Sequence, residues 1–208
     1  MRFLKCLIGL FVSMPAFSQG IVTWNFNNKA TGEGNGCGPG EVAFITAGNE
    51  MSVVFSGLVI AFNAGDATGG LSEQKTCRIV VPTKIQAGYY LSKLNQKLSY
   101  GYMRTDSTMG NVAAVTEFYS EAAANISQDI PTPGQDPYAV PLVEEEVSTE
   151  WKQTPERCVN RDYISTFKSS LVVIGKRENI AQDLKIAIDG HDIRFDVEGD
   201  TLLCSPSH

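Results

Sequence analysis

Few side chains of this sequence suggest catalysis or metal binding, and His191 is the foremost of them. It lies between Asp189 and Asp192 in the stretch IDGHDIRF. A carboxylate beside an imidazole can raise its basicity or fix its tautomer, so these residues could belong to a catalytic triad or a metal site. A triad also needs a nucleophile on a strained turn, and the chain lacks the Gly-x-Ser-x-Gly signature of that turn. We therefore interpret His191 as a polar turn residue and predict no catalytic residues.

A run of carboxylates offers a second possible chemistry, calcium binding. Glu144, Glu145 and Glu146 could combine with Asp129 and Asp136, since hard cations take several oxygen ligands. Successive side chains of an extended segment point to opposite faces, so three adjacent glutamates do not converge on one ion. We interpret them as a solvated acidic edge that deters strand pairing, and predict neither a metal site nor a cofactor.

Aromatic side chains could form a platform on which sugar rings stack. Tyr90, Tyr100 and Tyr102 share the apolar phase of one expected strand, which assigns them to the core. Tyr89 is out of that phase, and Trp151 lies in a different segment. Tyr89 and Trp151 are therefore the candidate ligand-binding residues.

Cysteines outside the N-terminal segment number four: Cys37, Cys77, Cys158 and Cys204. An even number in an exported chain indicates two disulfides, and no two of them have the Cys-x-x-Cys spacing of a zinc site. Pairing near neighbours closes loops of about 40 and 46 residues. The crossed alternative, Cys37 with Cys204 and Cys77 with Cys158, stays open. Cys37 lies in GNGCGPG, whose glycines suggest a flexible approach to its bridge.

The N-terminal stretch MRFLKCLIGLFVSMPAFSQG has the features of a secretory signal peptide. Arg2 and Lys5 precede an apolar run that ends before Pro15, and small residues follow at Ala16 and Ser18. The run is shorter than the roughly 20 residues that a membrane-spanning helix needs. We predict cleavage before residue 19, no membrane insertion, and a location outside the cytoplasm, either extracellular or periplasmic.

Cleavage would leave 190 of the 208 residues and, by removing two cations, would change the formal net charge from −6 to −8. This length suits one domain with a sizeable core. Scattered cations and a negative net charge argue against nucleic acid as a partner.

The rest of the sequence predicts short strands joined by polar turns. β-Branched and aromatic runs predict strands at these segments: 41–46, 51–63 with a break at Gly57, 77–82 closed by Pro82, 90–102, 111–120 and 169–175. Residues 184–197 alternate apolar and polar on both sides of Asp189-Gly190, which predicts a β-hairpin. No usable helical periodicity appears, except a possible short helix at 121–125.

Residues 120–157 contain five prolines and many carboxylates, which predicts a long proline-rich acidic loop, with an edge strand possible at 139–147. About ten short strands imply a single antiparallel β-sandwich, an all-β fold with two disulfides. The expected organisation is a signal peptide at 1–18, a flexible N-terminal segment at 19–35 and the sandwich domain at 36–208.

Several short motifs in order resemble a family of secreted proteins. These are GCGPGEVAF, CRIVVP followed by QAGYYL, Trp151 with Cys158, SSLVV, IDG and a terminal LLC. They are similar to domain-of-unknown-function family 4360. The resemblance implies a secreted, cysteine-bridged, mainly β protein with no assigned activity, and transfers no catalytic residues. Two departures are Cys37-Gly38-Pro39, where the family has Cys-Pro, and Leu202-Leu203, where it has a tryptophan near the last cysteine.

These observations favour a secreted or cell-surface module that is not an enzyme and binds glycan or a surface protein. The absence of a recognisable catalytic constellation supports this reading. The alternative is a secreted hydrolase acting on glycans or esters through a site that the sequence does not reveal. Fold alone supports neither.

Overall fold

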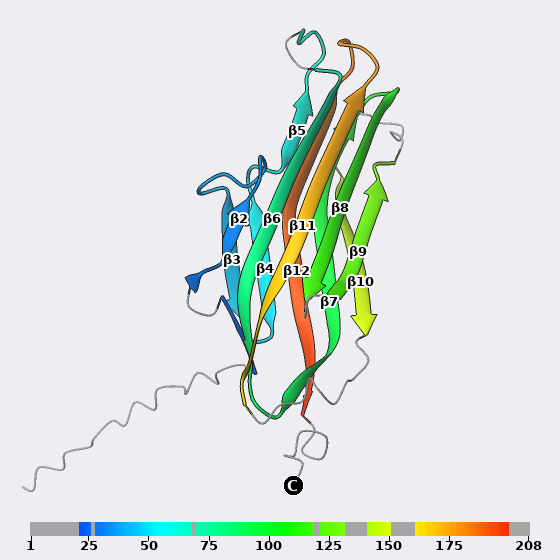
Figure 1. Cartoon of the computed structure of the whole chain (residues 1–208). Coiled ribbons are helices and arrows are strands. Elements are labelled where there is room, and N and C mark those ends of the chain that lie inside the picture. Colours follow the sequence, from blue (N-terminus) through cyan, green and yellow to red (C-terminus); the bar gives the residue numbers. More distant parts are fainter. Residues whose placement is uncertain are drawn as a thin grey trace, which may run out of the picture.

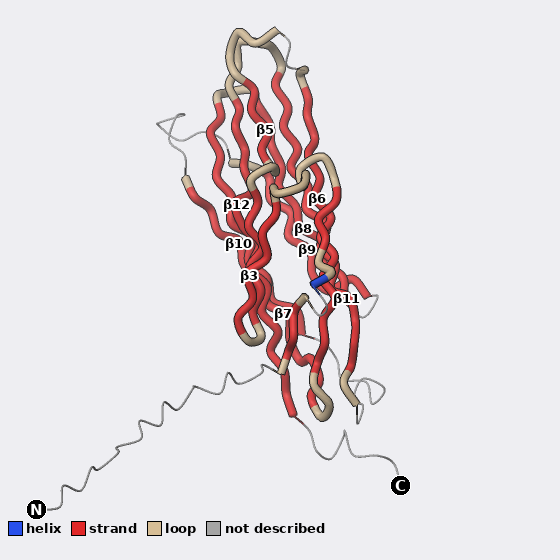
Figure 2. Tube along the Cα trace, turned by 90° about the vertical axis from the view of Figure 1, so that its left-hand side faces the viewer, coloured by secondary structure: helices blue, strands red, loops and turns tan. Residues whose placement is uncertain are grey.

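The computed structural model describes residues 21–25, 28–67, 70–118, 121–131, 141–150 and 161–199. Within these ranges the chain forms twelve strands in two antiparallel sheets that stack as a β-sandwich (Figure 1). This confirms the all-β prediction. Viewed from the side, the two sheets lie next to each other as separate layers (Figure 2). The described residues include no helix long and apolar enough to cross a membrane.

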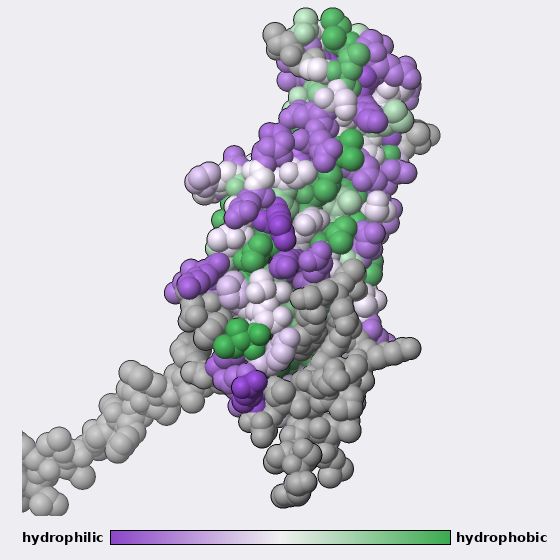
Figure 3. All heavy atoms as spheres, viewed as in Figure 1, coloured by the Kyte–Doolittle hydropathy of each residue, from purple (hydrophilic) through white to green (hydrophobic). Residues whose placement is uncertain are grey.

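Sheet A has the strand order β1-β6-β11-β8-β9, with β2 also paired to β6. Its strands are β1 (Val22–Trp24), β2 (Thr31–Glu33), β6 (Ser72–Ile85), β8 (Thr108–Phe118), β9 (Glu121–Asp129) and β11 (Tyr163–Arg177). Hydrophobic residues lie among hydrophilic ones on the face seen in Figure 3, which lies over β6, β11 and β8. The side chain of Val115 in β8, for example, is 38% exposed. Because this outer face is partly apolar, the sequences of β8 and β11 do not alternate strictly between apolar and polar residues.

Sheet B has the order β10-β7-β12-β4-β3, with β5 also paired to β12. Its strands are β3 (Val42–Ala47), β4 (Glu50–Phe55), β5 (Val59–Phe62), β7 (Tyr89–Arg104), β10 (Leu142–Glu150) and β12 (Leu184–Gly199). The alternation in β7 is clear, since Leu98 and Tyr100 are buried while Lys97 and Ser99 are only half-buried. Of the three tyrosines assigned to the core, Tyr90 and Tyr100 are buried as predicted, whereas Tyr102 is half-buried and packs against the core.

Pro82 does not end its strand, because β6 continues to Ile85. On one side β6 pairs with β11 throughout this region, including Thr166 opposite Pro82. On the other side β2 pairs with residues 78–80 and β1 with residues 83–85. Pro82 therefore falls in the gap between β1 and β2, where a strand tolerates a residue without an amide hydrogen.

Residues 120–157 are not one long loop. The segment that suggested a short helix, around residues 121–125, belongs to strand β9, and β10 spans Leu142–Glu150. β9 pairs with β8, and β10 is the edge strand of sheet B, where its glutamates can remain in solvent. Residues 132–140 and 151–160 lie outside the described part, so the prediction of a loop there is not tested.

The predicted hairpin at 184–197 is also wrong, because β12 is one continuous strand of 16 residues. It pairs with β7 along its length, and the register shifts between Ile188 and Gly190. On its other edge β5 pairs with residues 184–187 and β4 with residues 190–194. Asp189-Gly190 therefore lies at an irregularity opposite the break between β4 and β5, rather than at a reversal of the chain.

Sheet A begins before residue 36, where the sequence placed the start of the domain. β1 and β2 both pair with β6, although they fall in the segment interpreted as flexible. Trp24 of β1 is 5% exposed and its ring centroid lies 4.4 Å from that of Phe195 in β12. An aromatic contact of this kind between the two sheets makes β1 part of the core. Residues 1–20 are outside the described part, so the signal peptide is not tested.

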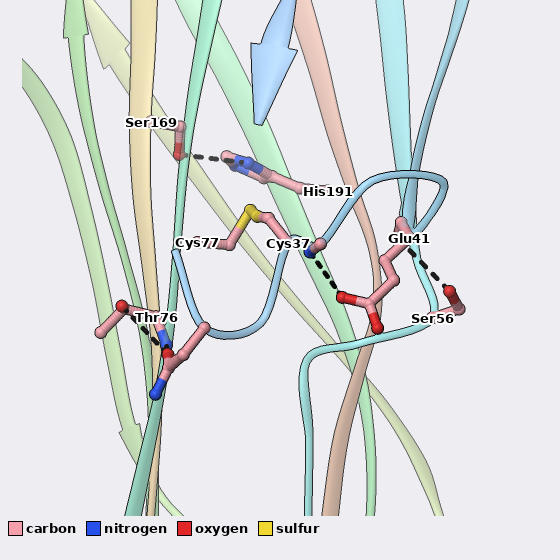
Figure 4. The surroundings of a disulfide bond; sticks show 9 residues. Cys37, Glu41, Ser56, Thr76, Cys77, Ser169 and His191 are labelled. Carbon is pink, nitrogen blue, oxygen red and sulfur yellow. Dashed lines mark hydrogen bonds between the residues drawn. A yellow bond between two sulfur atoms is a disulfide. The ribbon is translucent and has the colours of Figure 1, made fainter. Parts of the chain in front are cut away.

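Cys37 is bonded to Cys77, with 5.3 Å between their Cα atoms (Figure 4). This is the near-neighbour pairing, so the crossed alternative is wrong for these two cysteines. Cys37 lies between β2 of sheet A and β3 of sheet B, and Cys77 lies in β6. The bridge therefore attaches the crossover between the sheets to sheet A. Cys158 and Cys204 are outside the described residues.

The glycines before Cys37 provide close packing rather than flexibility. The amide of Gly36 donates a hydrogen bond of 2.9 Å to the carbonyl oxygen of Thr76, and a Cβ on Gly36 would collide with Leu58. Gly34 has a φ of 134°, and a Cβ there would meet the Thr76 carbonyl. The Asn35 side chain accepts a hydrogen bond of 2.7 Å from the Thr76 amide. Glycine is required because the segment lies directly against β6.

Candidate functional site

An open hollow of about 230 Å³ lies on the outer face of sheet B, across β10, β7, β12 and β4. Its polar lining consists of Glu50, Ser52, Asn95, Lys97, Glu146, Asp192 and Arg194. The sheet itself forms the floor at Met51, Gln96 and Ile193, whose side chains are buried.

Strand register brings these polar residues together from distant parts of the chain. Two rows of paired residues cross the four strands: Glu146, Lys97, Asp192 and Ser52 in one, and Ser148, Asn95, Arg194 and Glu50 in the other. The rows are two residues apart along each strand, so their side chains point to the same face. Along β12, Asp192 and Arg194 are exposed, whereas the alternate residues His191 and Ile193 are buried. The face that carries Asp192 and Arg194 is therefore the outer one.

Lys97 is one of the two cations that line the hollow, and strand pairing places it between Glu146 and Asp192. Its Nζ lies 2.7 Å from Oε1 of Glu144. The pKa of Lys97 is raised above its ordinary value, first by the hydrogen bond to Glu144 and further by the charges of Glu144, Asp192 and Glu146. Lys97 therefore stays protonated across the physiological range and presents a fixed positive charge.

Hydrogen bonds hold the second row in place. Nδ2 of Asn95 donates to Asp196 at 2.8 Å, and its Oδ1 accepts from the Ser148 hydroxyl at 2.5 Å. Nε of Arg194 lies 3.2 Å from Asp196. Asp196 thus positions both Asn95 and Arg194, and the three side chains come from adjacent strands of a rigid sheet.

Four other lining side chains make no hydrogen bond or ion pair with any side chain that the structure describes: Glu50, Ser52, Glu146 and Asp192. Three of these are carboxylates, which accept hydrogen bonds, and the serine hydroxyl both donates and accepts. The hollow therefore combines positioned donors with acceptors that have no hydrogen-bond partner among the described side chains, an arrangement suited to a ligand with many hydroxyl groups.

Of the two predicted ligand-binding residues only Tyr89 lies in the described part, and it does not line this hollow. Tyr89 begins β7, is half-buried and packs against the hydrophobic core. Trp151 follows Glu150, the last residue of β10, and lies outside the described part. The sequence missed the hollow because its lining comes from strands widely separated in the chain. The only local signal was the polar phase of β7 at Asn95 and Lys97.

His191 is not a turn residue, because it lies in the middle of β12 and is 0% exposed. Its Nδ1 lies 3.4 Å from the hydroxyl oxygen of Ser169 in β11, as Figure 4 shows, and its Nε2 lies 3.1 Å from Oε1 of Gln96 in β7. The Thr116 hydroxyl of β8 lies 2.6 Å from the same oxygen. Burial lowers the pKa of His191 to about 4. The imidazole is therefore neutral and links the two sheets internally.

The carboxylate run does not form a calcium site within the described residues. Glu144 and Glu146 are exposed on the outer face of β10, whereas Glu145 between them is half-buried on the other face. No group of three or more potential metal-ligating side chains is found in the part of the chain that the structure covers. Asp136 lies outside that part.

Comparisons with known proteins identify no family for this chain. No family model matches it, and no curated protein does. Among solved structures, TmCBM61 in complex with β-1,4-galactotriose aligns with a TM-score of 0.28 and 8% identity over 80% of this chain and 88% of the other. The enzymatically active domain of bacteriophage CBA120 tailspike protein 4 aligns with a TM-score of 0.25 and 7% identity, over 88% of this chain and 20% of the other. These TM-scores are too low to support any conclusion about ligand or activity.

Proposed function

We propose that this protein is an exported, non-enzymatic binding module that holds a glycan in the hollow on the outer face of sheet B. The observation that carries the proposal is the set of polar side chains that strand register brings into one hollow. Residues on adjacent strands of a sheet keep their relative positions, so the ligand meets a largely preformed site.

The chemistry of the lining supports a glycan as the ligand. Sugar hydroxyls donate to carboxylates such as Glu50 and Asp192, and accept from cations such as Arg194. The hollow is shallow and open, which suits a ligand that remains partly in solvent.

A secreted hydrolase is the alternative, and the described residues give it little support. A nucleophile and base must reach the substrate, whereas Ser169 and His191 are both 0% exposed between the sheets. We also propose export across a membrane, supported by the signal-peptide pattern at the N-terminus and by the disulfide between Cys37 and Cys77.

Screening the mature protein against a glycan array, with and without a substitution in the hollow, tests the proposal. We expect one glycan class to bind the wild type, and Asp192→Asn to weaken that binding by about tenfold, the effect of losing roughly 1.4 kcal/mol. The matched control is Asp189→Asn, because Asp189 is exposed on the same strand but does not line the hollow.

The outcomes separate the candidate functions. Equal weakening by the two substitutions would show that net charge, rather than the hollow, determines binding. Release of cleaved sugars during the incubation would favour the hydrolase. Failure to bind any glycan class, with intact folding, would contradict the proposed function.

A further inference from the structure

The edges of the two sheets are protected to different extents. Edge strands expose unpaired backbone groups, and proteins block them with charges, prolines, short strands or covering segments. Strand β10 carries Glu144, Glu146 and Glu150 on its exposed face, and β9 lies beside β10 in space. β1 and β2 have only three residues each.

Among the residues that the structure describes, none of these protections is found at strand β3. Its sequence, VAFITA, contains no charged residue and no proline over six residues. It pairs with β4 on one side, and no strand in the described ranges pairs with its other side. Figure 2 looks onto the side of the sandwich where β3 lies. The outer edge of β3 therefore offers a row of backbone donors and acceptors to another strand.

The conformation of β3 is fixed before any partner arrives. The turn from Ala47 to Glu50 places Gly48 at a φ of 57°, a left-handed conformation typical of tight hairpins. In the same turn, the Asn49 carbonyl accepts a hydrogen bond of 3.0 Å from the Phe195 amide. The inward side chain of Phe44 packs against the core. Little conformational entropy remains to be lost when the edge is paired.

We propose that the outer edge of β3 pairs with β3 of a second copy of this chain, antiparallel and about a twofold axis. In such an interface each strand faces its own sequence reversed, so a charged residue at the centre of the strand, or next to it, would face or adjoin its own copy. β3 is neutral throughout, and self-pairing therefore brings no like charges into contact.

Side chains add a contact between the two copies. Ile45 lies at the centre of β3 and is 59% exposed, and Val54 on the neighbouring strand β4 is 45% exposed. Pairing two β3 strands brings the Ile45 side chains of both copies onto the same outer face. This removes apolar surface from water on each copy.

The edge is short, so we expect a dimer that dissociates on dilution. Six residues span about 20 Å, and their pairing buries less than the roughly 1,600 Å² of a standard stable interface. The negative net charge of each copy opposes approach at low salt, and added salt screens this repulsion. Dimerisation should therefore strengthen as salt concentration rises.

Sedimentation velocity of the mature protein over a concentration series tests this inference. We expect the wild type to shift from monomer to dimer with increasing concentration, and Ile45→Lys to remain a monomer because its lysines would face each other across the axis. The control is Val115→Lys. Val115 is also exposed, but its strand pairs on both sides, so this variant should dimerise like the wild type.

Hydrogen exchange provides an independent measurement. Amides of β3 should exchange more slowly as the wild-type concentration rises, whereas those of Thr46→Lys, a second edge variant that preserves Ile45, should not change. A wild type that stays monomeric at every concentration and salt level would overturn the proposal. A dimer that Ile45→Lys does not weaken, or that Val115→Lys alone disrupts, would do the same, because either result places the interface elsewhere.

Discussion

The imidazole of His191 is enclosed between the two sheets, and its lowered pKa keeps it neutral in the folded chain at neutral pH. Its hydrogen-bonding partners Ser169 and Gln96 are neutral and buried, and so is Thr116, whose hydroxyl bonds to Gln96. The Gln96 carbonyl oxygen can only accept, so Nε2 of His191 donates to it and Nδ1 accepts from Ser169. Protonation would place a charge in this dry interior. The adjacent Asp192, on the outer face, offsets only part of that cost.

This burial predicts a loss of stability in mild acid. The pKa of His191 is about 4 in the folded state, against 6.5 for an ordinary histidine. The unfolded chain therefore takes up a proton first as pH falls. The stabilising effect is complete above pH 6.5 and disappears as pH falls towards 4, a loss of about 3 kcal/mol. Urea unfolding at a series of pH values measures it.

His191→Gln supplies the comparison, because it removes the titrating group and leaves all carboxylates in place. We expect the difference in unfolding free energy between wild type and variant to shrink as pH falls from 6.5 to 4. A constant difference would contradict the assignment. If the variant does not fold, NMR titration of the wild-type imidazole provides the folded-state pKa directly.

At the scale of elements, the continuity of β12 organises sheet B. β4 and β5 lie end to end along one edge of β12, and β7 follows the other. The register shift at Ile188/Gly190 lies opposite the short connection between β4 and β5, where the Ile188 amide donates to the Leu58 carbonyl at 3.1 Å. β12 can therefore pair with two short strands along one edge without reversing direction.

Gly190→Ala distinguishes a continuous β12 from a hairpin at Asp189-Gly190. A two-residue hairpin turn would hold Gly190 at positive φ, whereas in the structure its φ lies outside the left-handed region and a Cβ would meet only the Val53 carbonyl, at 3.7 Å. We expect the free energy of unfolding to change by less than about 0.5 kcal/mol.

The control for this substitution is Gly48→Ala in the true hairpin turn between β3 and β4. Gly48 has a φ of 57°, so alanine there should cost about 1 kcal/mol or more. Thermal or urea unfolding of both variants gives the comparison. A larger cost at Gly190 than at Gly48 would indicate that the chain turns at Asp189-Gly190.

The errors in the sequence predictions have identifiable physical causes. Residue type and two-residue alternation are local signals, so β3 and β4, marked by β-branched and aromatic runs, and β7, marked by alternation, were predictable. β9 was not, because alanine and polar residues at a sheet edge lack the apolar phase of a central strand. Asp-Gly favours a turn, and pairing with β7 overrides that preference in β12. The hollow was beyond prediction, because Glu50 and Asp192 meet only through strand pairing that the sequence does not encode locally.

At the scale of the whole molecule, pairing through β3 would combine the two proposals. A twofold axis perpendicular to the sheet makes sheet B continuous between the copies, with both outer faces on the same side. The hollow is centred between β7 and β12, and six strand spacings separate this point from its counterpart in the other copy, so the two hollows would lie about 29 Å apart. The dimer would thus carry its two glycan sites on the same side.

This geometry predicts avidity for a surface on which the bound glycan is dense. Wild type and Ile45→Lys should bind a single soluble glycan chain equally, because Ile45 does not line the hollow. On a densely coated surface, the wild type should bind at least tenfold more tightly than Ile45→Lys, because its second site binds at high effective concentration. Val115→Lys, which leaves the edge intact, should match the wild type. Surface plasmon resonance at low and high glycan density measures both affinities. Equal binding of wild type and Ile45→Lys at high density would contradict the paired arrangement, whereas loss of monovalent binding in Ile45→Lys would show that the hollow and the edge are not independent.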